Sequence, residues 1–271
     1  MAAARLTAKN ADRHGLYETS VQHPPTDIAF MDRIFRRRHD GRRPERLRED
    51  FCGTGLMAAA WAKSHLRREA IGLDLHQPTM DYGRRKHLLP LGAASQRVRL
   101  MHRNVLDGAG APAHFDVVAA FNFSYCGLRR RDDLVRYFRR AAAELRAGGG
   151  FFLDIHGGTE VFEEMEESTR HRGFRYIWDQ EPYDPINGTT RRHIHFRFAD
   201  GSELKRAFSY DWRLWTIPEM REVLMEAGFA EVEVYWEGLD GHGGGNGVFR
   251  RARKADNEAA WIAYVVAWKG R

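Results

Sequence analysis

The feature that most constrains the fold is an alternation of strand-like and helix-like segments, which begins near residue 46 and continues to residue 155. Short apolar runs, typical of buried strands, are separated by longer segments in which apolar residues recur at helical spacing. This alternation predicts βαβ units and a mostly parallel sheet. The expected strands are 47–51, 70–75, 97–101, 115–121 and 151–155, and the expected helices are 27–37, 55–66, 77–89 and 131–146.

The second half of the chain has a different pattern. Segments within 174–212 alternate between apolar and polar residues and are joined by turn residues, which predicts antiparallel strands. A capping box begins at Thr216, so we expect a helix there that ends at Gly228. Two last strands are expected at 232–236 and 261–268, joined by the glycine-rich loop 238–247.

The composition fits a folded protein that holds no disulfide framework, since Cys52 and Cys126 are its only cysteines. No apolar run reaches the roughly 18 residues of a membrane helix, and the N-terminus lacks the pattern of a secretory signal, so we expect a cytoplasmic protein. The net charge of +6 raises the possibility of a nucleic-acid partner. The arginines are spread in short runs without interleaved aromatic residues, which favours solvation of many faces instead.

A glycine turn joins the first expected strand to the first helix in the segment EDFCGTG (49–55). Gly53 and Gly55 allow a ligand to approach the backbone closely, and the start of the following helix offers free N–H groups. Asp74 ends the second strand, nineteen residues after Gly55, where a carboxylate can accept hydrogen bonds from both hydroxyls of a ribose. The arrangement predicts a nucleotide-like ligand at this turn.

Two classes of ligand use such a turn. Gly53, Gly55 and Ala58 also satisfy the dinucleotide fingerprint, so an NAD(P)-dependent oxidoreductase is one alternative. Three features weigh against it. Some 45 residues precede the first strand, Glu49 is an acidic residue inside that strand, and the chain closes with a helix and two strands that suit an antiparallel hairpin.

Taken together, these motifs resemble those of the class I S-adenosylmethionine-dependent methyltransferases, in particular the small-molecule branch that includes glycine and sugar N-methyltransferases. The resemblance implies a Rossmann-like, seven-stranded, mostly parallel α/β sheet that ends in an antiparallel C-terminal hairpin. The segments that carry it are 49–55, 71–75, 103–107, 115–125, 145–155 and 220–235. The implied regions are an N-terminal helical cap (1–45), a cofactor-binding core (46–156), an antiparallel β insertion that covers the carboxyl edge and the substrate (157–213), and a C-terminal helix and hairpin that complete the core sheet (214–271).

The resemblance also implies contacts to S-adenosyl-L-methionine. Glu49 would orient the turn and approach the methionine amino group, Asp74 would take the ribose hydroxyls, and the amide oxygen of Asn104 could accept from the adenine amino group. Phe51 replaces the first glycine of the family motif. Since a bulky residue cannot take a glycine-only conformation cheaply, we expect Phe51 to pack beneath the helix. The other implied contacts are Tyr17, Cys52, Gly53, Thr54, Gly55, Leu75, Val105 and Asn122.

Two residues are candidates for the chemistry itself. His156 follows the fifth strand directly, at the edge where ligands of open α/β sheets bind, so it is a candidate base; a hydrogen bond to a loop is the alternative. Asn122 and Tyr125 match the Asp/Asn-Pro-Pro-Tyr motif of amino-directed methyltransferases, but both prolines are missing. Tyr125 is therefore a weaker catalytic candidate than His156.

The acceptor has its own candidate contacts. Tyr17 lies in a segment that folds over the cofactor in many relatives of the family, and Tyr183 lies in a turn between cover strands. Arg213 could hold an acidic group, or could pair with Asp211 or another acid of the chain. His193 and His195 share one face of a strand, but no third residue has the spacing of a metal ligand, so no metal is expected.

The function expected from these features is transfer of a methyl group from S-adenosylmethionine to a nitrogen or oxygen of a small molecule. One alternative is an RNA or protein methyltransferase, which would gather the arginines of 36–43, 129–131 and 191–192 around one pocket mouth. The NAD(P)-dependent oxidoreductase and a non-catalytic binder of the same cofactor are the others. No membrane contact is expected, and the insertion could mediate a homodimer.

Overall fold

A mostly parallel sheet forms the centre of the protein in the computed structural model, which describes residues 6–240 and 244–271. Within these residues the sheet has eight strands, in the order β11-β10-β12-β5-β4-β1-β2-β3. β12 is antiparallel to both of its neighbours, β5 and β10, which gives the predicted closing hairpin. The strands are β1 (Arg46–Asp50), β2 (Glu69–Asp74), β3 (Val98–His102), β4 (Phe115–Ala120), β5 (Leu145–Gly157), β10 (Glu231–Leu239), β11 (Gly245–Ala252) and β12 (Trp261–Trp268).

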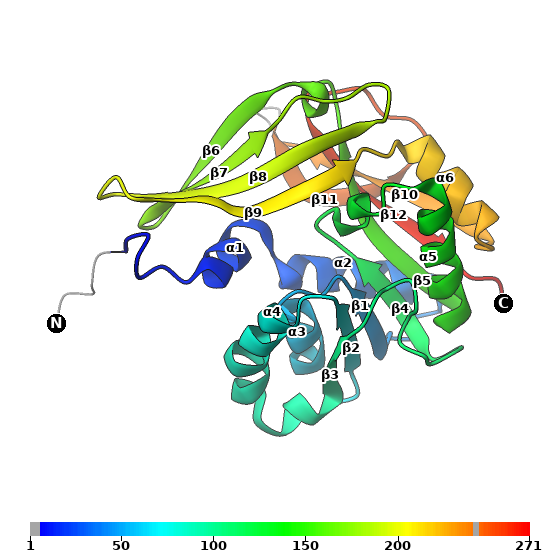
Figure 1. Cartoon of the computed structure of the whole chain (residues 1–271). Helices are drawn as coiled ribbons and strands as arrows, with labels where there is room; N and C mark the ends of the chain where they lie inside the picture. Colours follow the sequence, from blue (N-terminus) through cyan, green and yellow to red (C-terminus); the bar gives the residue numbers. More distant parts are fainter. Residues whose placement is uncertain (1–5, 241–243) are drawn as a thin grey trace.

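Helices cover both faces of this sheet (Figure 1). Buried side chains of α2 and α3 pack in one cluster, and those of α5 and α6 pack in another. Because successive strand residues point to opposite faces, Phe152 belongs to the first cluster and Phe151 to the second. None of the helices in the described ranges is long and apolar enough to cross a membrane. The helices are α1 (Arg13–Val21), α2 (Pro24–Arg38), α3 (Leu56–Ser64), α4 (Gln77–Gly83), α5 (Arg131–Glu144) and α6 (Ile217–Glu226).

A second, antiparallel sheet lies over the carboxyl edge of the large sheet (Figure 1). Its strands follow one another in sequence order, so each pairs with the next. The sheet agrees with the antiparallel cover in the predicted fold class. Its strands are β6 (Met165–His171), β7 (Phe174–Gln180), β8 (Thr189–Phe198) and β9 (Glu203–Arg213).

The structure departs from the predicted elements mainly at edge strands. β6 and β11 were not predicted, and β11 raises the large sheet from the expected seven strands to eight among the described residues. Both lie at sheet edges, β6 is mostly exposed and polar, and β11 begins with glycines, so neither carries an apolar alternation. The predicted loop 238–247 includes residues 241–243, which lie outside the described residues, and β11 begins at its end.

Two predicted boundaries also change. The helix expected over 77–89 ends at Gly83 and continues as a π-helical turn (Arg84–Leu88) and a 3₁₀ segment (Leu89–Arg97). The strand expected over 151–155 begins earlier, at Leu145, so Gly148 lies inside β5 with a positive φ of 69°. The capping box at the start of α6 is confirmed, since Thr216 and Glu219 bond reciprocally.

A buried ion network joins β1 to α5. Arg48 is completely buried and donates to both carboxylate oxygens of Asp50, at 2.9 and 2.7 Å, and to Glu144 at 2.7 Å. The hydroxyl of Tyr137 also donates to Asp50, at 2.7 Å. Since each buried charge has a partner, the network fixes the strand that leads into the glycine turn.

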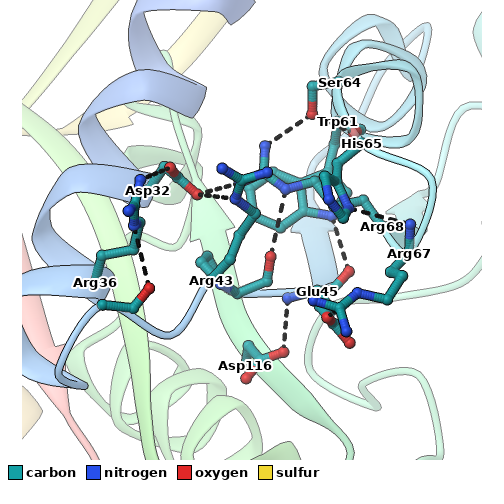
Figure 2. Close-up of polar contacts among 12 residues, drawn as sticks. Asp32, Arg36, Arg43, Glu45, Trp61, Ser64, His65, Arg67, Arg68 and Asp116 are labelled. Atoms are coloured by element: carbon teal, nitrogen blue, oxygen red, sulfur yellow. Dashed lines mark hydrogen bonds and ion pairs between the residues drawn. The ribbon is translucent and has the colours of Figure 1, made fainter.

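Another network lies at the amino-terminal edge of the large sheet (Figure 2). Arg68 stacks over Trp61, with its guanidinium carbon 4.0 Å from the ring centroid, and donates to Ser64 Oγ at 2.7 Å. Asp32 of α2 pairs with Arg68 and, at 3.8 Å, with Arg43. This basic cluster therefore holds α2 against the starts of β1 and β2, far from the edge that the second sheet covers.

Candidate active site

The glycine turn between β1 and α3 is held from the end of β2. Gly53 N donates to Asp74 Oδ2 at 2.8 Å, and His76 N donates to Asp74 Oδ1 at 2.8 Å. Gly53 and Gly55 have positive φ angles of 52° and 70°. A Cβ on Gly53 would meet only Thr79, at 3.9 Å, whereas one on Gly55 would meet Leu100 at 2.7 Å. The turn is thus packed tightly beneath Gly55 and open above Gly53, as a ligand cradle requires.

The expectation for Phe51 is wrong in part. Phe51 adopts the left-handed conformation, with φ 55°, that the family's glycine would take. Its ring packs edge-on against Tyr137 of α5, with the centroids 5.7 Å apart. A non-glycine residue pays about 1–3 kcal/mol for this backbone, and the aromatic packing helps to hold it there.

Glu49 and Cys52 lie beneath the turn and are buried. Ala58 N, at the start of α3, donates to Glu49 Oε2 at 2.8 Å, so Glu49 orients the turn as predicted. Burial, helped by the nearby Asp74 and Asp50 carboxylates, raises the pKa of Glu49 to about 8. Burial also raises the pKa of the Cys52 thiol, which excludes it as a thiolate nucleophile.

Helix α1 closes over the turn. Glu18 Oε1 accepts from Thr54 Oγ1 and contacts His87 Nε2, each at 2.6 Å. Asp12 accepts from the hydroxyl of Tyr82 at 2.5 Å. Figure 1 shows α1 between the second sheet and α3–α4 of the core. Tyr17 of this helix therefore reaches the space between the two sheets, as the lid prediction requires.

The residues predicted near the adenine of the cofactor differ in how well they are placed to contact a ligand. Leu75 follows Asp74 and is 62% exposed, so it offers an apolar surface beside the turn. Asn104 lies past the end of β3, but its Oδ1 already accepts from Leu106 N at 2.9 Å. Val105 is buried in the core, which leaves only its backbone for a ligand.

A cavity of about 430 Å³ lies where the second sheet covers the ends of β4 and β5. Asn122, Phe123 and His156 form part of its floor, Tyr17 contributes from α1, and aromatic residues of β7 and β9 form the cover. The three predicted residues Tyr17, Asn122 and His156 thus meet in one place. The main aromatic lining on the cover side is Tyr176, Trp178, Tyr210 and Trp212.

Asp154 holds the backbone at the floor of the cavity, a role that was not predicted from the sequence. Asn122 N donates to Asp154 Oδ2 at 2.8 Å and Phe123 N donates to Oδ1 at 2.9 Å. Both donors have positive φ angles, 57° and 54°, which non-glycine residues rarely adopt. Burial raises the pKa of Asp154 to about 7 despite these two bonds. The only signal in the sequence was an acidic residue within the otherwise apolar strand before His156.

His156 is half-buried between Phe123 and Trp212, with ring centroids 4.2 and 5.8 Å away, and both of its ring nitrogens are buried. Among the described residues, neither of its ring nitrogens has a hydrogen-bond partner, so the alternative of a loop-binding histidine is not supported. Burial and the Arg192 guanidinium lower the pKa of His156 to about 4. The imidazole is therefore neutral near pH 7 and can accept a hydrogen bond, but it is a weaker base than an ordinary histidine.

Tyr125, Tyr183 and Arg213 do not line this cavity. Tyr125 is completely buried in the core, where burial raises its pKa well above the usual range, so it has no direct route to an acceptor. Tyr183 and Arg213 line a larger neighbouring cavity of about 1370 Å³, which shares His156 with the first. Arg213 lies over Trp215 at 3.8 Å and contacts Glu219 at 3.4 Å, so it pairs with an acid of the chain other than Asp211.

The remaining polar motifs of the sequence have structural partners. His193 contacts Glu181 at 2.8 Å and Ser209 at 2.7 Å, and His195 contacts Asp179 at 3.0 Å. The arginine runs at 36–43, 129–131 and 191–192 line neither of the two cavities at the carboxyl edge. The arrangement that would favour an RNA or protein acceptor is therefore not found.

Comparison with known proteins agrees with this geometry. Residues 51–149 match the model of a family described as a methyltransferase domain. A putative methyltransferase of Bacillus subtilis, YqeM, is 22% identical over 183 residues, which cover 66% of this chain and 70% of that protein.

Three solved structures are similar over nearly the whole chain. An S-adenosylmethionine-dependent methyltransferase from Clostridium acetobutylicum has a TM-score of 0.70 at 15% identity, covering 95% of this chain and 98% of that one. DesVI from Streptomyces venezuelae has a TM-score of 0.68 at 18% identity, covering 96% and 100%. The sugar N-methyltransferase KedS8 from Streptoalloteichus has a TM-score of 0.63 at 18% identity, covering 98% and 94%.

Proposed function

We propose that the chain, which has the Rossmann-like fold of S-adenosylmethionine-dependent methyltransferases, transfers a methyl group from S-adenosyl-L-methionine to a nitrogen or oxygen of a small molecule. The family match and the fold agree with the class predicted from the motifs and give no support to an NAD(P)-dependent oxidoreductase. The observation that supports a small-molecule acceptor is the aromatic cavity at the ends of β4 and β5, whose volume of about 430 Å³ suits a small molecule.

The residues at the glycine turn fit the cofactor. Gly53 leaves open space above the turn, Asp74 stands at the end of β2 beside it, and the exposed Leu75 offers an apolar contact for a base. When bound, S-adenosylmethionine supplies a methyl group on a positively charged sulfur. Tyr17 and Asn122 would lie between this turn and the acceptor cavity.

The chain's own contribution to the reaction is mainly positioning. Asp154 holds the backbone of Asn122 and Phe123, so the floor of the cavity is rigid where the acceptor must approach. The second sheet and α1 cover the cavity and contribute part of its lining. His156, neutral and without a partner among the described residues, would accept a hydrogen bond from the acceptor and pass the released proton on to solvent, since its low pKa disfavours keeping it. A cytoplasmic location and a homodimer through the insertion stay predictions.

Calorimetry tests the cofactor first. S-adenosylmethionine and S-adenosylhomocysteine are expected to bind, NAD(P) is not, and Asp74→Ala is expected to abolish binding. Asp211→Ala is the matched control, because Asp211 is an exposed acid of β9 that pairs with Arg191 of β8. Binding of NAD(P) alone would overturn the proposal. Unchanged binding in Asp74→Ala would instead remove Asp74 from the site.

His156 is tested by single-turnover methyl transfer once an acceptor is found. His156→Gln is expected to slow transfer by about 100-fold with little change in cofactor affinity. An equal loss of cofactor affinity would indicate a structural role for His156.

A further inference from the structure

The charge of the acceptor cavity is opposite to that of the whole chain. The protein has a net charge of +6, yet among the described residues the cavity lining contains three glutamates, Glu160, Glu167 and Glu237, and no lysine or arginine. Its one basic side chain is His156, which is neutral for the reasons given above. Arg192 of β8 is completely buried outside this lining, although its charge acts on His156. The lining itself therefore contains acidic side chains and no arginine or lysine among the described residues.

The walls of the cavity are aromatic on several sides. Trp178 and Trp212 of the cover have ring centroids 5.7 Å apart, and Tyr210 lies 5.1 Å from Trp212. Phe123 faces them from the core, 6.1 Å from Trp212. Tyr17 of α1 completes the ring of aromatic residues around the cavity. Such an arrangement favours a cation through the electron-rich ring faces.

The carboxylates lie on the same faces as these rings. Glu167 of β6 is directly opposite Trp178 of β7, so both project into the cavity from neighbouring strands. Glu237 lines the core side, where its Oε1 accepts from Gly247 N at 2.7 Å. Within residues 6–240 and 244–271, no ion pair joins Glu160, Glu167 or Glu237 to a basic side chain. Three carboxylates without a cationic partner there are complementary to a positively charged ligand.

We propose that the acceptor is a basic aliphatic amine, which enters this cavity as an ammonium ion between the aromatic rings and the carboxylates, and is methylated on nitrogen. The inference rests on the proposed methyl transfer and names its acceptor class. The ammonium first loses a proton to solvent through His156. The nitrogen lone pair then forms the new bond to the methyl carbon while the carbon–sulfur bond breaks with its electron pair left on sulfur. The positive charge passes from sulfur to nitrogen.

The charge present during methyl transfer favours a nitrogen acceptor over an oxygen acceptor at this site. With an amine, one positive charge is present before and after the transfer, and the aromatic rings and carboxylates can stabilise it throughout. A hydroxyl would have to lose its proton and react as an anion. Glutamates and ring faces would repel that anion, and no arginine or lysine of the described lining would stabilise it.

A pair of probes of the same shape tests the cation preference without turnover. Choline and 3,3-dimethylbutan-1-ol differ only in that one carries a quaternary ammonium where the other has a neutral carbon. We would titrate each into the full chain and follow tryptophan fluorescence, since Trp178 and Trp212 line the cavity. Choline is expected to bind at least about fivefold more tightly. Equal affinities would overturn the proposal.

Two matched pairs of variants test which side chains produce the preference for choline. Glu167→Gln is expected to reduce the choline preference by about two- to fivefold. Glu166→Gln removes the same charge from the neighbouring residue, which points to the other face of β6, and is expected to leave the preference unchanged. Trp178→Leu is expected to lower the preference, while Trp178→Phe retains most of it. Equal effects of the two glutamine variants would overturn the assignment of the cavity.

Cofactor calorimetry on the same samples keeps the two proposals apart. If the full chain prefers choline but does not bind S-adenosylhomocysteine, the result would count against the proposed methyl transfer. Intact cofactor binding without a choline preference would count against the amine acceptor alone.

Discussion

Replacing Gly83 with alanine is expected to destabilise the protein and to weaken cofactor binding. Gly83 ends α4, and a Cβ built on it would lie 1.7 Å from the carbonyl oxygen and 2.5 Å from the carbonyl carbon of Thr54, in the glycine turn. Close contacts between carbon and a carbonyl oxygen are about 3.3 Å. The turn or the helix would therefore have to move by about 1.6 Å, the difference between the 3.3 and 1.7 Å carbon–oxygen distances.

The turn has little freedom to make that movement. Gly53 N is bonded to Asp74 at 2.8 Å, and Gly55 N to the carbonyl of Cys52 at 2.8 Å. Overpacking of a well-packed interior costs about 1–3 kcal/mol, occasionally more. Alanine returns about 1 kcal/mol in helix propensity. Because the contacted atoms belong to the backbone, we expect the clash to cost about 3 kcal/mol or more, the upper end of this range. The net loss is then about 2 kcal/mol, or about 4–8 °C in Tm.

Thermal unfolding and S-adenosylhomocysteine calorimetry would measure both effects. Gly127→Ala is the control, because a Cβ at Gly127 meets no atom within 4 Å and its backbone does not need glycine. The control is expected to keep the wild-type Tm and affinity. A Gly83→Ala variant with unchanged Tm and unchanged affinity would refute the view that close packing of α4 shapes the turn.

Three further predictions test other parts of the structure. Arg48→Met is expected to lower the free energy of unfolding by about 3–5 kcal/mol in urea titrations, since it leaves the Asp50 and Glu144 carboxylates buried without their cation; a loss below about 1 kcal/mol would contradict this. Glu18→Gln is expected to weaken S-adenosylhomocysteine binding by about fivefold, because α1 loses its charged bond to the turn; equal affinity would argue against a lid. With a pKa lowered from 6.5 to about 4, His156 is expected to reduce stability as the pH falls from 6.5 towards 4, because only the unfolded chain takes up the proton; the His156→Gln variant should lack that slope.

The cofactor side of the site could largely be predicted from the sequence. The strand–turn–helix at Gly53 and Gly55 is local, and the spacing to Asp74 follows from one βαβ unit. What failed there was the assumption that only glycine takes a left-handed conformation. Phe51 takes it because Tyr137, distant in the sequence, packs against its ring.

The acceptor side could be predicted only in part. His156 was found because it ends a strand, but Asp154 was not, since its role depends on backbone groups of Asn122 and Phe123 in another strand connection. Tyr183 and Arg213 were placed in the cover correctly, yet they line the neighbouring cavity. Strand β6, which brings Glu167 to the cavity, is polar and exposed and gave no strand signal.

The sequence by itself determined the order of most strands and helices and the glycine turn, because these depend on periodicity and on spacing within single units. The cofactor was implied by the resemblance of its motifs to those of a known family. Only the tertiary structure decided what the acceptor meets. Its cavity is built from α1, the ends of β4 and β5, and the inner face of a separate sheet, segments that lie up to some 200 residues apart. The neutrality of His156 has the same origin, since burial by these elements and the Arg192 charge from β8 act on it together.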